Sequence, residues 1–112
     1  MPPIVHQIRH SCKRRLFDSR YPCQAMNGPS PDIHIKCSKC SVVSGFRFKL
    51  PRWIAPEIPA PIHCSEEMCL ARICDLSLPC GLTDDQDNAD VSIKCWRCGK
   101  ITHIYLLGVA DP

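Results

Sequence analysis

Two cysteine pairs with nearly the same flanking sequence constrain this chain more than any other feature. Residues 32–40 read DIHIKCSKC, and residues 90–98 read DVSIKCWRC. Aliphatic and polar residues alternate before each pair, which predicts a strand that leads into a tight turn. The residues after each pair alternate in the same way. We therefore expect two similar β-hairpins, each presenting two thiols at its turn.

The two predicted turns together supply the ligands of one structural zinc site. Zinc takes four tetrahedral ligands, and structural sites leave no position open. Backbone N–H groups in a C-x-x-C turn point at the sulfurs and offset the thiolate charge, and Gly99 suits the tight turn after the second pair. The four predicted ligands are Cys37, Cys40, Cys95 and Cys98.

Four further cysteines lie in the 54-residue interval between the two pairs. A long interval is acceptable because the entropy of loop closure grows slowly with length. These thiols could close a second zinc site, with His63 as a substitute ligand. The alternative is that one or two of them are buried apolar side chains. The four cysteines are Cys64, Cys69, Cys74 and Cys80.

A looser group of candidate ligands lies near the N-terminus. Residues of this kind are often solvated, so a third site is only one interpretation of them. His34 and His103 flank the cysteine pairs, and we expect them to be packed or surface residues because the tetrahedron is already complete. The looser group consists of His6, His10, Cys12 and Cys23.

The cysteine content admits either metal sites or disulfides, and the compartment decides between them. Ten cysteines in 112 residues are typical of both classes. Residues 1–17 lack the apolar segment and the cleavage site of a signal peptide, so we expect a cytoplasmic, reducing location and bound zinc. Seven aromatic residues and eleven prolines leave a small core that needs such support. A secreted disulfide scaffold is the alternative.

The predicted fold class is a small metal-stabilised β-rich (α+β) domain. It is a zinc ribbon of two β-hairpin knuckles with a long cysteine-rich insertion. A basic arm covers residues 1–31, and the zinc-ribbon domain covers residues 32–112, with its insertion at residues 51–90.

The insertion itself divides into an extended connector and a helix. Four prolines in residues 51–63 exclude a helix there. Ser65 then suits a helix N-cap, with two acids after it, and predicts one short helix that runs through residues 68–75.

Charge and motifs favour a binding function over an enzyme. The formal charge is +3, but residues 1–56 carry +8 and residues 57–112 carry −5. This asymmetry predicts a basic face for an anionic partner. The chain has neither the zinc-deaminase pattern, nor H-E-x-x-H, nor a glycine-rich phosphate loop. Paired C-x-x-C turns leave no open zinc position, so we expect no enzymatic activity.

Basic and aromatic residues at the predicted hairpins indicate a nucleic-acid contact, with RNA slightly preferred. Basic side chains neutralise phosphates, and aromatic faces stack on unpaired bases. The alternative is a half-buried strand in which Phe46 and Phe48 are core and the charges between them are solvated. The predicted contacts are Lys39, Arg47, Lys49, Trp96 and Arg97.

Two segments carry a resemblance to a known family. IKCSKCSVVSGFRFK and SIKCWRCGKITHI resemble the two halves of the Com-like zinc-finger family of Mu-type phages, over about a third of the chain. The resemblance implies a small zinc ribbon that regulates translation by binding messenger RNA, with the two cysteine pairs as its ligands. The family has a short interval between the halves, whereas this chain has a long one.

The acidic second half supports an alternative function. A protein-interaction adaptor or inhibitor would use the insertion to face a basic protein partner. The acids concerned are Glu66, Glu67, Asp75, Asp84, Asp85, Asp87 and Asp90.

Overall fold

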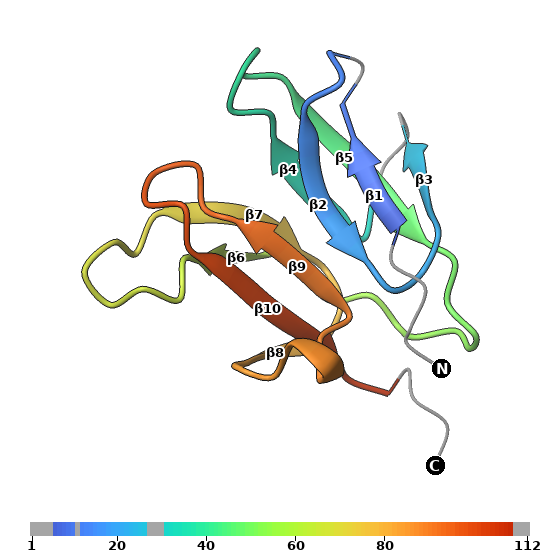
Figure 1. The fold of residues 1–112 in the computed structure, drawn as a ribbon. Coiled ribbons are helices and arrows are strands. Elements are labelled where there is room, and N and C mark those ends of the chain that lie inside the picture. The colour runs from blue at the N-terminus through green and yellow to red at the C-terminus, as the bar shows by residue number, and fades with distance from the viewer. Residues whose placement is uncertain (1–5, 11, 27–30, 109–112) are drawn as a thin grey trace.

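Two five-stranded antiparallel sheets make up the fold. The computed structural model describes residues 6–10, 12–26 and 31–108, and within these residues the only helix is the short 3-10 turn η1, Gln86–Asn88 (Figure 1). The first sheet has the order β1-β2-β9-β10-β8, and the second has the order β3-β5-β4-β7-β6. The strands of the first sheet are β1 (His6–Arg9), β2 (Arg15–Ser19), β9 (Val91–Lys94), β10 (Ile101–Leu106) and β8 (Cys80–Thr83). Those of the second are β3 (Cys23–Met26), β5 (Val43–Phe48), β4 (Ile33–Lys36), β7 (Arg72–Leu76) and β6 (Ala60–His63).

The ten described strands form two interlocked copies of one five-stranded unit. Replacing β1 to β5 by β6 to β10, and the reverse, converts the strand order of one sheet into that of the other. Each sheet takes strands from both copies, because β2 pairs with β9 and β7 pairs with β4. Reciprocal backbone bonds join the copies, from Arg20 N to Asp90 O and from Ser77 N to Asp32 O, both at 2.8 Å. The two copies are therefore related by an approximate two-fold axis.

The core lies between the two sheets. Alternating burial along β4 and β9 places Ile33 and Ile93 inside, as their aliphatic spacing predicts. Phe17 of the first sheet packs edge to face against Phe46 and Phe48 of the second, with ring centroids 5.6 and 6.2 Å apart. Phe46 and Phe48 are thus core residues of a half-buried strand, which is the alternative that their sequence pattern left open.

The structure confirms the β-rich class and both predicted hairpins, β4–β5 and β9–β10. The predicted helix through residues 68–75 is wrong. Only one turn forms, in which the Glu66 carbonyl accepts bonds from the N–H groups of Cys69 and Leu70. Leu70 then adopts a left-handed conformation, with a φ of 53°, which ends the turn. β7 follows, and its Ile73 and Leu76 are buried in the core.

The segments that the sequence assigns to an arm and to an insertion both contribute to the sheets. Residues 1–31 supply β1, β2 and β3, and residues 51–90 supply β6, β7 and β8. The proline-rich connector is extended as predicted, and its last residues form β6, an edge strand that contains Pro61. No helix in the described residues is long and apolar enough to cross a membrane.

Candidate metal centres and an adjoining cationic groove

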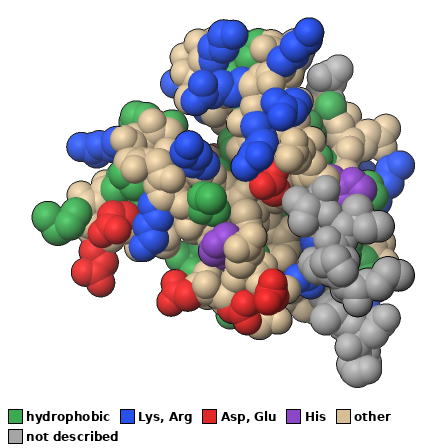
Figure 2. All heavy atoms as spheres, viewed as in Figure 1, with side chains coloured by type: hydrophobic (Ala, Val, Ile, Leu, Met, Phe, Trp, Pro, Cys, Tyr) green, Lys and Arg blue, Asp and Glu red, His purple; other side chains and the backbone are tan. Residues whose placement is uncertain are grey.

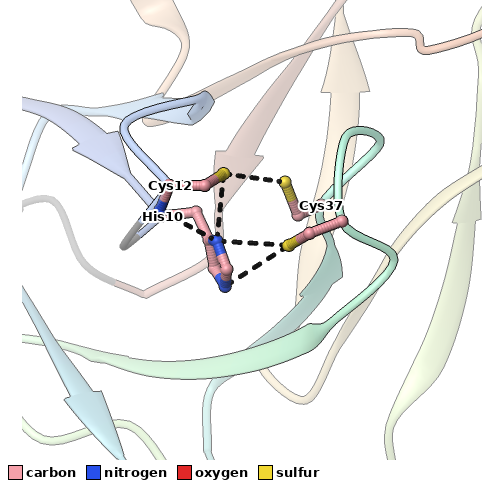
Figure 3. Close-up of side chains that lie close together, drawn as sticks. His10, Cys12 and Cys37 are labelled. Atoms are coloured by element: carbon pink, nitrogen blue, oxygen red, sulfur yellow. Dashed lines mark hydrogen bonds between the residues drawn. The ribbon is translucent and has the colours of Figure 1, made fainter.

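The first candidate metal centre, which we call site 1, joins two turns from different sheets. His10 and Cys12 lie in the β1–β2 turn, and Cys37 and Cys40 lie in the β4–β5 turn. All four ligand atoms lie within 4.8 Å of one another. The Sγ atoms of Cys12 and Cys37 are 3.6 Å apart, and His10 Nδ1 lies 3.2 Å from Cys12 Sγ and 3.4 Å from Cys40 Sγ (Figure 3).

Site 2 is the equivalent centre of the second copy. Cys64 and Cys69 lie in the β6–β7 turn, and Cys95 and Cys98 lie in the β9–β10 turn. The Sγ atoms of Cys64 and Cys98 are 3.5 Å apart, and those of Cys69 and Cys95 are 3.7 Å apart. His10 directly follows β1 as Cys64 directly follows β6, so the two centres use equivalent positions.

The donor sets and distances of both sites fit zinc. A tetrahedral ion with Zn–S bonds of 2.3 Å sets its sulfurs about 3.8 Å apart, close to the observed separations. A disulfide would require about 2.05 Å, and all ten cysteines are free thiols. Four cysteines, or three cysteines and one histidine, are donor sets of structural zinc sites. The two groups are therefore positioned to hold metal ions, consistent with zinc at one or both.

The protein environment prepares two of the thiols for metal binding. The backbone N–H of Cys40 lowers the pKa of Cys37 to about 7. Burial raises the pKa of Cys95, but the N–H groups of Cys98 and Arg97 outweigh it and bring the value to about 7. Burial raises the pKa of Cys64 to about 12, and binding of a metal ion to such a thiol releases its proton.

The predicted single site of four cysteines is not what the structure shows. Cys37 and Cys40 belong to site 1, whereas Cys95 and Cys98 belong to site 2. The physical reason is the interlocked fold, which places each C-x-x-C turn beside the first turn of its own copy.

The predicted second and third ligand groups are each divided by the structure. Cys64 and Cys69 enter site 2, but Cys74 and Cys80 lie on β7 and β8 outside both sites. Cys74 is buried in the core, as the apolar alternative proposes, and burial raises its pKa to about 12. His63 is exposed and lies 3.1 Å from the Leu70 carbonyl oxygen instead of at a metal.

In the looser N-terminal group, His10 and Cys12 become ligands of site 1, whereas His6 and Cys23 lie on β1 and β3 outside it. Burial raises the pKa of Cys23 to about 11, and its thiol donates to the Tyr21 carbonyl. One sequence feature indicates which ligands belong together. Arg15 and Asp18 precede the first C-x-x-C hairpin in the chain, and the same residue types recur as Arg72 and Asp75 before the second hairpin.

A cationic groove adjoins both centres. The cavity has a volume of about 1140 Å³ and runs from the β1–β2 turn past β2 and β9 to the β9–β10 turn. Figure 2 shows the hollow below the upper part of the molecule, where Lys and Arg side chains gather. Seven basic residues are among its described lining residues: Arg9, Lys13, Arg14, Arg15, Arg20, Lys36 and Lys94.

Of the predicted nucleic-acid contacts, Trp96 lines this groove, and the other four are exposed outside it. Lys39 and Arg97 lie in the two C-x-x-C turns. Arg47 and Lys49 lie on or just after β5. Most of the groove cations come from the segment that the sequence assigns to a basic arm, in which the run Lys13-Arg14-Arg15 is a second candidate phosphate contact.

No family model matches this chain, and neither a curated protein nor a solved structure matches it. The resemblance to the Com-like family therefore stays a prediction based on two sequence segments.

Proposed function

We propose that this protein is a zinc-stabilised, non-enzymatic regulatory protein that binds nucleic acid in the cationic groove. The concentration of seven basic residues in one cavity carries the proposal. Phosphates are the anions that such a surface neutralises, and a groove of this volume accepts several linked phosphates. The sequence slightly favours RNA over DNA as the ligand. The family resemblance implies a role in translational regulation.

The positive charge of the groove is only partly neutralised by the protein itself. Three aspartates are among its described lining residues. Two of them form ion pairs with lining arginines, Asp18 with Arg15 at 3.4 Å and Asp90 with Arg20 at 3.3 Å. Among the described residues, no ion pair engages Lys13, Arg14, Lys36 or Lys94. These four cations are available to a ligand.

Site 1 supports the groove directly. Arg9 is adjacent to His10, Lys13 is adjacent to Cys12, and Lys36 is adjacent to Cys37. A metal ion that holds these ligands therefore fixes the cations of two turns from different sheets along one wall. The role proposed for zinc is to assemble the binding surface, with no part in a reaction.

The acidic alternative has less support from the structure. Asp90 is buried and paired with Arg20, and Asp75 is bonded to Arg72. Part of the acidic charge counted in the sequence is thus used inside the protein.

The test is binding of fluorescein-labelled single-stranded RNA and DNA to the zinc-loaded chain, followed by anisotropy at increasing salt. Affinity should fall steeply with salt because binding releases counterions. The double variant K13A/R14A should weaken binding and reduce the salt slope by about 2. The matched control R47A/K49A removes two cations outside the groove. A greater loss of affinity in the control would show that the nucleic acid binds at β5 instead of in the groove. No binding at low salt would exclude the proposed function.

A further inference from the structure

A second cavity adjoins the cationic groove across the approximate two-fold axis. Its volume is about 590 Å³, and it shares four lining residues with the groove: Lys36, Ser38, Ile73 and Trp96. Its other lining residues are the two-fold equivalents of groove residues. Arg72 and Asp75 correspond to Arg15 and Asp18, and His34 corresponds to Ser92. The two cavities are therefore adjoining halves that are related by the same approximate two-fold axis as the two copies.

The two halves differ in chemistry although they are related in fold. Among the described lining residues of the second cavity, the only Lys or Arg side chains are Lys36 and Arg72. Arg72 is bonded to Asp75, with 2.9 Å between Nε and Oδ1. Apolar surface comes from Val43, Ile73 and Trp96. This half suits a flat, uncharged group with polar edges, whereas the groove suits phosphates.

Trp96 lies at the junction of the two halves. Its indole Nε1 donates a hydrogen bond of 3.1 Å to the Arg72 carbonyl, which restrains the ring by its edge. The side chain is nevertheless 62 % exposed, so much of the ring surface remains uncovered. The equivalent position in the first copy is Ser38, so at this position only the second copy carries an aromatic ring. A restrained and uncovered indole is a platform on which a base can stack.

We propose that the second cavity binds an unpaired nucleobase of a strand whose phosphates lie in the cationic groove. The base stacks on Trp96, and its polar edge meets His34 and the Arg72–Asp75 pair. The ligand class is then single-stranded nucleic acid, because the bases of a duplex are already stacked and paired. This inference rests on the proposed function and adds a base-binding subsite to it.

The experiment compares a short single-stranded oligonucleotide with an abasic strand that has the same number of phosphates. The zinc-loaded protein should bind the base-bearing strand about ten-fold more tightly, since one stacked base contributes on this scale. Trp96→Ala should remove the difference between the two strands. Trp53→Ala is the matched control, because Trp53 is 82 % exposed and lines neither cavity.

A second measurement does not depend on the fold of the alanine variant. In a Trp53→Phe background Trp96 is the sole tryptophan, and its emission should be quenched by the base-bearing strand but not by the abasic strand. Equal affinity for the two strands in the unaltered protein would overturn the base subsite and leave the groove in place. Binding of neither strand at low salt would instead overturn the proposed function. An equal loss in Trp53→Ala and Trp96→Ala would also overturn this subsite.

Discussion

The residue after each C-x-x-C pair adopts the same left-handed conformation in both copies. Ser41 has a φ of 63°, and its equivalent Gly99 has a φ of 80°. The N–H of each bonds to the carbonyl of the first cysteine of its pair, Cys37 or Cys95, at 2.8 and 3.0 Å. A left-handed backbone is strained for any residue with a Cβ atom and unstrained for glycine. The first copy therefore carries strain that the second copy avoids.

We expect the two residues to respond in opposite directions to exchange. Gly99→Ser should lower the free energy of unfolding by about 1 kcal/mol, because it places a Cβ atom in the left-handed region. Ser41→Gly should raise it by up to about 1 kcal/mol for the converse reason. Urea denaturation of the zinc-loaded protein measures both. Ser38→Gly is the control, as Ser38 has no positive φ, and a gain there equal to that of Ser41→Gly would contradict the explanation.

Two buried aspartates fix the hairpins that carry the metal ligands. Asp32 accepts a hydrogen bond from Phe48 N at 2.9 Å, and Asp90 accepts one from Leu106 N at 2.7 Å. Asp90 also pairs with Arg20. Each carboxylate therefore joins the residue just before its hairpin to the end of the second strand of that hairpin.

Replacing either aspartate by alanine should destabilise the protein. Asp32→Ala leaves a buried N–H without an acceptor, which costs about 1–3 kcal/mol. Asp90→Ala should cost more, because it also removes the ion pair with Arg20. Thermal and urea unfolding measure the losses, and the exposed Asp84→Ala should stay within about 0.5 kcal/mol of the unaltered protein. Losses no larger than this control would show that these bonds do not stabilise the hairpins.

At the scale of turns, the two metal centres offer a symmetric pair of variants. Cys12 and Cys69 are equivalent ligands in the β1–β2 and β6–β7 turns. Cys12→Ser and Cys69→Ser should each reduce the zinc content by about one ion per chain, since thiolates are the preferred ligands. With free zinc at one hundred times Kd, the lost site would have contributed about 2.7 kcal/mol of stability. Elemental analysis and denaturation test both values, and unchanged zinc content in either variant would exclude that centre.

Nucleic-acid affinity should separate the two variants. The lining cations Arg9, Lys13 and Lys36 are next to ligands of site 1, whereas Lys94 alone is next to a ligand of site 2. Cys12→Ser should therefore weaken binding more than Cys69→Ser does, and it should also reduce the salt slope more. Equal effects would mean that zinc maintains the groove only through global stability.

The sequence predicts the C-x-x-C hairpins well because their signal is local. In β4 and β9 the apolar residues alternate with a period of two, and the cysteines follow directly. The helix predicted at the turn through Cys64 and Cys69 is wrong because it also rests on a local signal. Ser65 and Glu66 form a local pattern that is typical of a helix start. In the structure, Cys64 and Cys69 of this turn instead lie beside Cys95 and Cys98 of the β9–β10 turn, which is distant in the sequence.

Local sequence patterns do not predict which cysteines share a metal ion. Two C-x-x-C turns supply the four ligands that a structural zinc ion requires. Whether the two turns meet depends on the arrangement of the strands in the two sheets, which the ligand count does not include. The full duplication is hard to detect in the sequence because the separation between equivalent residues changes along the chain. The separation from His10 to Cys64 differs from the separation from Cys37 to Cys95. Few identities survive outside the hairpins, so the full extent of the second copy becomes clear only from the strand order and from the pairing of β2 with β9 and of β7 with β4.

At the scale of the whole molecule, the interlocked sheets join the two copies into one cooperative unit. Neither copy forms a complete sheet, because β1–β2 and β6–β7 each pair with strands of the other copy. Site 1 and site 2 each connect the first sheet to the second. Loss of one metal ion should therefore affect both copies, even where the other centre is intact.

We expect a single unfolding transition in the zinc-loaded protein and also in Cys69→Ser, which retains site 1. Far-UV circular dichroism reports both sheets, and the emission of Trp96 in a Trp53→Phe background reports the β9–β10 turn alone. The two signals should change with the same midpoint and the same slope on urea, shifted together to lower urea in the variant. The two signals should change together because each sheet contains strands of both copies. Unfolding of β9 and β10 also removes β9 from its pairing with β2. A β9–β10 turn that unfolded at lower urea than the rest of the chain would show that each copy is stable by itself.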